Sequence, residues 1–168
     1  MKQRIINFAV LVTVVVAVGS GVVYAADMFS GTWKLNIAKS TFGAGPAPKE
    51  ATISRYEITP EGMKLISEGT TSKGNAAHSQ YVFKFDGKDY PGSQTITIDG
   101  IPDERASDQT ISAKKIDDYT IEFTFKNKGE VTSHAKAVIS KDGKTETYTS
   151  TYTVEGQEKK NVTIWDKQ

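Results

Sequence analysis

The sequence contains no cysteine, which excludes disulfides, thiol nucleophiles, thiolate metal sites and lipidated cysteine anchors. It has only two histidines, His78 and His134, and they lack the close His/Glu spacing of a zinc site. A Gly-rich phosphate loop and a Gly-x-Ser-x-Gly nucleophile elbow are also missing. We therefore expect no metal, no cofactor and no identifiable catalytic residue, and stability must come from packing and strand pairing.

The chain also lacks an excess of charge, since 21 basic residues face 20 acidic ones. Nucleic acids and anionic membranes are bound through a clustered basic excess. The balanced charge therefore predicts neither partner.

One long apolar stretch is present, and its position at the start predicts a cleaved export signal. Lys2 and Arg4 precede an uncharged apolar run over residues 5–18, and Ala25 ends a cleavage pattern of small residues. A membrane anchor is the alternative, but a span needs about 20 apolar residues, and Gly and Ser at 19–21 interrupt this run.

Cleavage after Ala25 would leave residues 26–168 as the mature protein. Two of the 21 basic residues would be lost with the signal, which leaves 19 against 20 acidic residues and a net charge of about −1. This length suits one domain with a real core and is too short for two. We expect that domain in the bacterial periplasm or outside the cell, with no membrane span.

The mature sequence reads as short alternating strands separated by turns rich in Gly, Asp and Asn. Loops are predicted over 36–50, which is rich in Gly and Pro, and over 99–108. About ten strands are predicted, near residues 31–36, 51–59, 63–70, 78–86, 94–98, 109–116, 119–125, 130–140, 144–154 and 159–166.

The short connections make neighbouring strands antiparallel partners. A meander of this length must protect its edges, and closure does so most simply. The sequence therefore predicts an all-β fold, a single antiparallel up-and-down β-barrel of about 8 to 10 strands.

Alternation assigns one face of each strand to the interior, and aromatic residues dominate those faces. A barrel of eight strands is filled by its own side chains, whereas a barrel of nine or ten strands leaves room for a ligand. A fully packed core and a ligand cavity are therefore both alternatives here. A continuous apolar cavity of about 300 Å³ or more would favour the ligand. The candidate lining residues are Tyr81, Phe83, Phe85, Ile121, Phe123, Phe125, Tyr148 and Tyr152.

The same alternation places His78 and His134 on the polar faces of their strands, beside Gln80 and Lys136. Surface histidines are therefore expected. A haem site would require one of them to point inward, against the pattern.

Three segments resemble the calycin superfamily of lipocalins and fatty-acid-binding proteins, and most of all its small exported bacterial lipocalin-like members. They are 31–35 (GTWKL), 140–145 (SKDGKT) and 162–167 (VTIWDK). The resemblance implies that Trp33 plugs the closed end of the barrel under a basic side chain from the last strands. Either a lysine such as Lys159 or Lys160 takes that covering role, or no residue does.

Two departures argue against fatty-acid binding. The resembling fatty-acid carriers have a helical lid where this chain has its Gly/Pro loop, and their carboxylate-binding arginine corresponds to Thr163. Arg55 is the other candidate for an anion. Its strand parity with Ile53 would turn it inward, whereas a bulge near Tyr56 would turn it outward.

These observations predict an exported lipocalin-like barrel that binds a small apolar or amphipathic molecule in its interior. The alternative is a ligand-free structural or interaction protein of the cell envelope. An enzyme is the third interpretation, and it would require an inward polar cluster that contains a titratable group.

Overall fold

The computed structural model describes residues 27–43, 45–104, 108–154 and 156–168. The predicted signal peptide, residues 1–25, lies outside this part. The described residues form eleven strands and no helix, which confirms the all-β prediction. Within them, therefore, no helix is long and apolar enough to cross a membrane.

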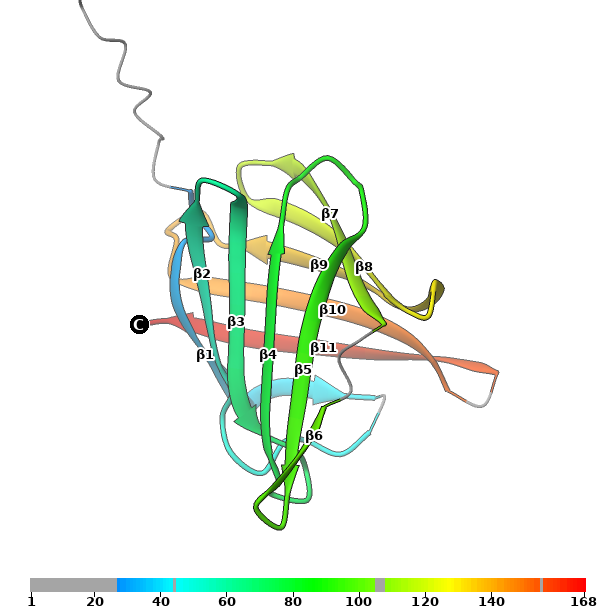
Figure 1. Ribbon diagram of the computed structural model, residues 1–168. Coiled ribbons are helices and arrows are strands. Elements are labelled where there is room, and N and C mark those ends of the chain that lie inside the picture. Colours follow the sequence, from blue (N-terminus) through cyan, green and yellow to red (C-terminus); the bar gives the residue numbers. More distant parts are fainter. Residues whose placement is uncertain (1–26, 44, 105–107, 155) are drawn as a thin grey trace, which may run out of the picture.

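The strands follow one another with short connections along most of the chain (Figure 1). Their bounds are β1 Gly31–Phe42, β2 Ile53–Thr59, β3 Gly62–Thr70, β4 Ala76–Phe83, β5 Tyr90–Ile98, β6 Ile101–Glu104, β7 Gln109–Asp117, β8 Thr120–Asn127, β9 Glu130–Ile139, β10 Thr145–Val154 and β11 Gln157–Lys167.

Ten of these strands close into an antiparallel barrel, as predicted. Each strand from β1 to β5 pairs with the next, β5 pairs with β7, and β7 to β11 continue the meander until β11 returns to β1. Strand β6 pairs only with β5 and lies outside the ring. The β5–β7 seam is short, since only Tyr90 and Pro91 of β5 pair across it.

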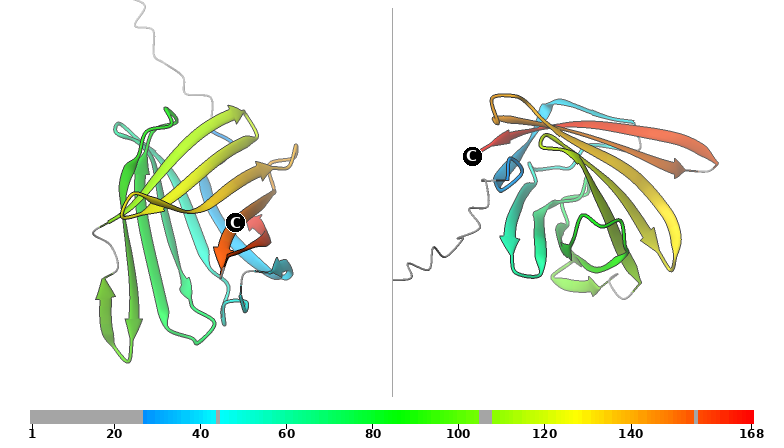
Figure 2. Two further views of the ribbon diagram at one scale, coloured as in Figure 1. Left: turned by 90° about the vertical axis from the view of Figure 1, so that its right-hand side faces the viewer. Right: turned by 90° about the horizontal axis from the view of Figure 1, so that it is seen from above.

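The barrel has two walls that cross steeply. Strands β2 to β5 run upright in Figure 1, and β9 to β11 cross behind them. Figure 2 shows the same walls from the side and from above, on opposite sides of the interior. Side chains on the inner faces of both walls therefore meet in the middle.

Aromatic rings fill much of that interior. Phe83 packs edge-on against Phe85 and Phe123, with ring centroids 5.7 and 5.8 Å apart. Small buried residues of β9, Ala135 and Ala137, face the same core and leave space for these rings. The core is thus dense near the end of the barrel where β1 begins.

Strand β1 extends to Phe42, so the predicted loop over 36–50 was wrong in its first part. Between Asn36 and Thr41, β1 carries four residues against one on β11, which forms a large irregular bulge. The Ser40 hydroxyl donates to the Asn36 carbonyl (2.7 Å) and accepts from the Ile164 N–H (3.0 Å). These bonds replace ladder bonds that the bulge breaks, and pairing with β11 then resumes.

The predicted loop over 99–108 was also wrong in part, because β5 and β6 form a hairpin there. Asp99 and Gly100 both have positive φ, 50° and 79°, as a two-residue turn of type I′ requires. Pro102 is tolerated in β6 because that strand pairs on one side only.

Candidate functional site

The barrel interior keeps a cavity of about 270 Å³, slightly smaller than the volume of about 300 Å³ that would favour a ligand. It lies between the inner faces of β2 to β5 on one side and those of β8, β10 and β11 on the other. The lining residues are Thr52, Ser54, Tyr56, Leu65, Ser67, Ser79, Tyr81, Gln94, Phe125, Glu146, Tyr148 and Trp165.

One wall of the cavity is a row of small polar side chains. Ser54, Ser67, Ser79 and Gln94 are direct cross-strand neighbours on β2, β3, β4 and β5. The hydroxyls of Ser54 and Ser67 lie 2.8 Å apart and form a hydrogen bond. This row offers donors and acceptors to a ligand and takes up little volume.

The next row toward the start of β1 is larger and ends in a tight contact. Tyr56, Leu65, Tyr81 and Gly92 are cross-strand neighbours on the same four strands. The Tyr81 ring lies directly over Gly92, where a Cβ would overlap it. Glycine at 92 therefore allows the Tyr81 ring to occupy its place in the cavity wall.

Side-chain hydrogen bonds tie the walls together near the short β5–β7 seam. The Tyr81 hydroxyl donates to Oε1 of Gln109 (3.2 Å), and the Gln109 amide donates to Oε1 of Gln94 (3.1 Å). The seam thus has side-chain bonds where backbone pairs are few.

Aromatic side chains form the opposite wall. Tyr148, Phe125 and Trp165 come from β10, β8 and β11. The Trp165 indole N–H donates to the Thr163 hydroxyl (3.0 Å), which itself donates to the Tyr148 carbonyl (3.2 Å). The indole N–H is thereby satisfied, and the ring is held in a fixed orientation.

Among the described residues, Glu146 is the one acidic side chain that lines the cavity, and it is only 2% exposed. It pairs with Ile139 of β9 and with Trp165 of β11. Its Oε2 has no hydrogen-bond partner in the part of the chain that the structure describes. Burial raises the pKa of this carboxyl to about 8.

Burial also raises the pKa of Tyr56 and of Tyr148 well above the ordinary value, and the nearby Glu146 carboxyl adds to both shifts. Both phenols are therefore neutral at physiological pH. They remain available to the cavity as hydrogen-bond donors and as aromatic faces.

The eight predicted lining residues separate into three groups. Tyr81, Phe125 and Tyr148 line the cavity. Ile121, Phe123 and Phe83 are buried in the dense core. Phe85 lies with Phe83 at a separate hollow between β4 and the β2–β3 turn, and Tyr152 faces another hollow beside Phe42 and Pro46. The structure therefore does not bring all eight together.

Trp33 is fully buried, and its indole N–H donates to the Phe29 carbonyl (2.8 Å). The lysine that covers it is Lys167, whose ammonium nitrogen lies 5.0 Å from the ring centroid. Lys159 and Lys160 were the wrong candidates. Antiparallel pairing sets the end of β11 beside the start of β1, so Trp33 pairs with Lys167.

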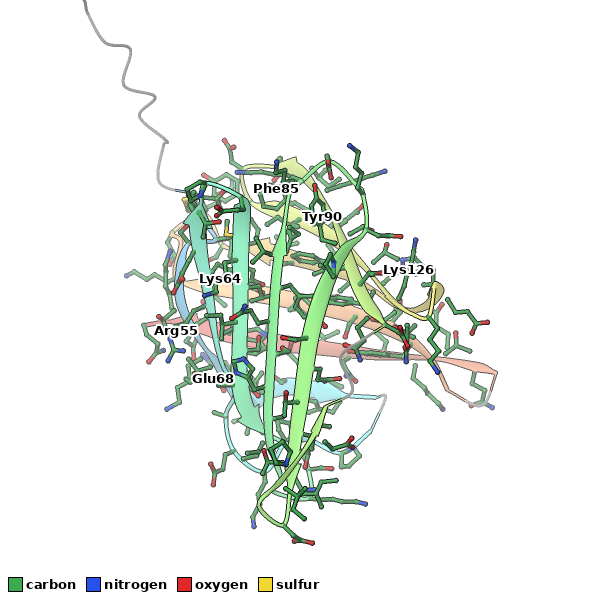
Figure 3. All side chains as sticks on the ribbon, viewed as in Figure 1. Arg55, Lys64, Glu68, Phe85, Tyr90 and Lys126 are labelled. Carbon is green, nitrogen blue, oxygen red and sulfur yellow. The ribbon has the colours of Figure 1, made fainter. Side chains whose placement is uncertain are left out.

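Arg55 points outward, with 41% of its side chain exposed, and pairs with Glu68 at 2.7 Å (Figure 3). Ser54 and Tyr56 occupy the inner face of β2 instead. Both histidines are exposed, as alternation predicted. In the part of the chain that the structure describes, no three His, Asp or Glu side chains gather as metal ligands.

Sequence reasoning missed Glu146 and the serine row. Glu146 shares strand parity with Tyr148 and Tyr152, so alternation alone places it inside. The serine row had no comparable signal, since it depends on the register between four strands.

No family model matches this chain, and no curated protein matches it.

Proposed function

We propose that this protein is an exported, lipocalin-like barrel that binds a small, non-acidic apolar or amphipathic molecule in its interior cavity. The observation that carries the proposal is the open space of about 270 Å³ beside Tyr81, Phe125, Tyr148 and Trp165 in an otherwise dense aromatic interior. The closed antiparallel barrel and a lysine of the last strand above Trp33 support the calycin resemblance.

Charge inside the cavity argues against a carboxylate ligand. Arg55 is outside and already paired with Glu68, and Thr163 stands where the resembling carriers have an arginine. Glu146 adds an acid to the cavity instead of a cation. A buried carboxylate without a cationic partner has a desolvation cost of several kcal/mol.

The cavity volume limits the ligand to a small molecule. It equals the liquid volume of about nine water molecules and lies slightly below the range of about 300 to 1,000 Å³ for drug-sized ligands. Burying about 250 Å² of apolar surface contributes about 6 kcal/mol. Association costs about 4 kcal/mol or more, so specific polar contacts must set the affinity.

A titration of Trp165 fluorescence with 2-phenylethanol and with phenylacetate tests the proposal. The alcohol should bind, and the acid should bind no more tightly. Ser79→Phe fills the cavity and should abolish binding, whereas His78→Phe, on the outer face of the same strand, should not. If neither compound binds, the ligand-free structural interpretation replaces this one. If the acid binds more than about tenfold tighter than the alcohol, the non-acidic assignment is wrong.

A further inference from the structure

Glu146 presents a buried acceptor that no described residue uses. Its side chain is almost fully buried, lines the cavity and leaves Oε2 without a hydrogen bond. A buried polar atom of this kind destabilises the empty protein. Because the atom borders an open space, a group that enters the cavity can satisfy it.

The surroundings of Glu146 define which group that is. The titratable side chains whose pKa the Glu146 carboxyl raises are Tyr56 of β2 and Tyr148 of β10. The strand neighbours of Glu146 on β9 and β11 are Ile139 and Trp165. No ion pair among the described residues includes Glu146. One carboxylate among phenols and an indole is also a poor ligand set for a metal ion.

We propose that the ligand carries a protonated amine whose ammonium group pairs with Glu146 against the rings of Tyr56, Tyr148 and Trp165. This inference rests on the proposed function and specifies its ligand class. The amine supplies the positive charge that the cavity lacks, and it donates the hydrogen bond that Oε2 lacks.

The aromatic wall suits a cation as well as an apolar body. Tyrosine and tryptophan faces attract ammonium groups, most strongly where water is excluded. The lysine over Trp33 shows the same type of contact on the outer side of the plug. With a volume of about nine waters, the cavity fits an arylalkylamine of about ten non-hydrogen atoms.

Ionisation of Glu146 links amine binding to pH. Its pKa is about 8, so the empty site is mostly protonated at pH 7. Pairing with an ammonium group requires the carboxylate, so binding releases close to one proton at that pH. Amine affinity should rise about tenfold per pH unit up to pH 8 and then level off, until the amine itself deprotonates near pH 10.

The test compares 2-phenylethylamine with 2-phenylethanol, which has the same size, by calorimetry at pH 6, 7 and 8. At pH 8 the amine should bind at least tenfold tighter than the alcohol, whose affinity should not change with pH. Glu146→Gln should bring the two affinities within about threefold. Glu122→Gln, at an exposed acid on β8 paired with Lys136, should retain the full preference.

Several results would overturn the inference. Equal affinities for amine and alcohol in the wild type would be consistent with binding in the cavity but would contradict the assignment of an amine ligand. Loss of the preference in Glu122→Gln would show a general attraction for cations. Failure of both compounds to bind would defeat the proposed function as well. Because Glu146→Gln acts on a buried group, proton release by the wild type, measured in two buffers, gives an independent answer, and its absence contradicts the pairing.

Discussion

At the scale of single residues, Glu146 makes stability depend on pH. Its pKa is about 8 in the folded protein against 4.5 for the free side chain. Between these values the unfolded chain releases a proton that the folded protein keeps, so stability falls as pH rises, by about 1.4 kcal/mol per pH unit. Urea unfolding at pH 5, 6, 7 and 8 should show this loss in the wild type. Glu146→Gln should remove that component, and parallel curves for the two proteins would contradict it.

Truncation of Trp33, near the start of β1, is expected to lower the free energy of unfolding strongly. The side chain is fully buried, and its indole N–H is bonded to Phe29. Trp33→Ala should therefore destabilise the protein by about 3 to 5 kcal/mol. His78→Ala and His134→Ala are exposed controls and should stay within about 0.5 kcal/mol of the wild type. Denaturant unfolding of the three variants measures these changes in the free energy of unfolding. A large loss of stability in either histidine variant would favour a metal or haem site at that histidine.

At the scale of elements, the packing of β4 against β5 depends on Gly92, because glycine has no side chain. Gly92→Ala places a methyl group against the Tyr81 ring, which must move into the cavity or away from Gln109. We expect a loss of about 1 to 3 kcal/mol, typical of overpacking, together with weaker ligand binding. Gly45→Ala is the control, because its added Cβ meets no atom within 4 Å.

A double-mutant comparison isolates that contact. In a Tyr81→Ala background, Gly92→Ala should cost little, because the ring it displaces is absent. If Gly92→Ala costs as much there as in the wild type, the overlap with Tyr81 is not its cause.

The sequence predicted most strands because alternation and turn residues are local signals. It missed β6, although Asp99-Gly100 between two isoleucines is itself a hairpin signal. The end of β1 could not be predicted, since residues after Asn36 become a strand only through the bulge and pairing with β11. For the cavity, strand alternation correctly predicted that Tyr81, Phe125 and Tyr148 line it. Alternation could not distinguish the inward rings that pack against one another from those that border open space.

At the scale of the whole molecule, the predicted signal peptide gives a further test. Cleavage after Ala25 follows the pattern of charged, apolar and small residues at the start of the chain. N-terminal sequencing of protein recovered from the periplasm or medium should therefore begin at Ala26. Recovery of an intact N-terminus in the membrane fraction would favour the anchor instead.

Pairing of β1 with β11 also determines when the barrel can close during synthesis of the chain. Asn36 donates to Asp166 of β11, a residue 130 positions later, so the ring of strands cannot close until β11 has been made. Contacts between such distant positions slow folding, and until then the edge of β1 stays open to other strands. If the chain is exported as we propose, this delay is an advantage, because a barrel that cannot close before β11 has emerged stays in a form that a translocation pore can accept.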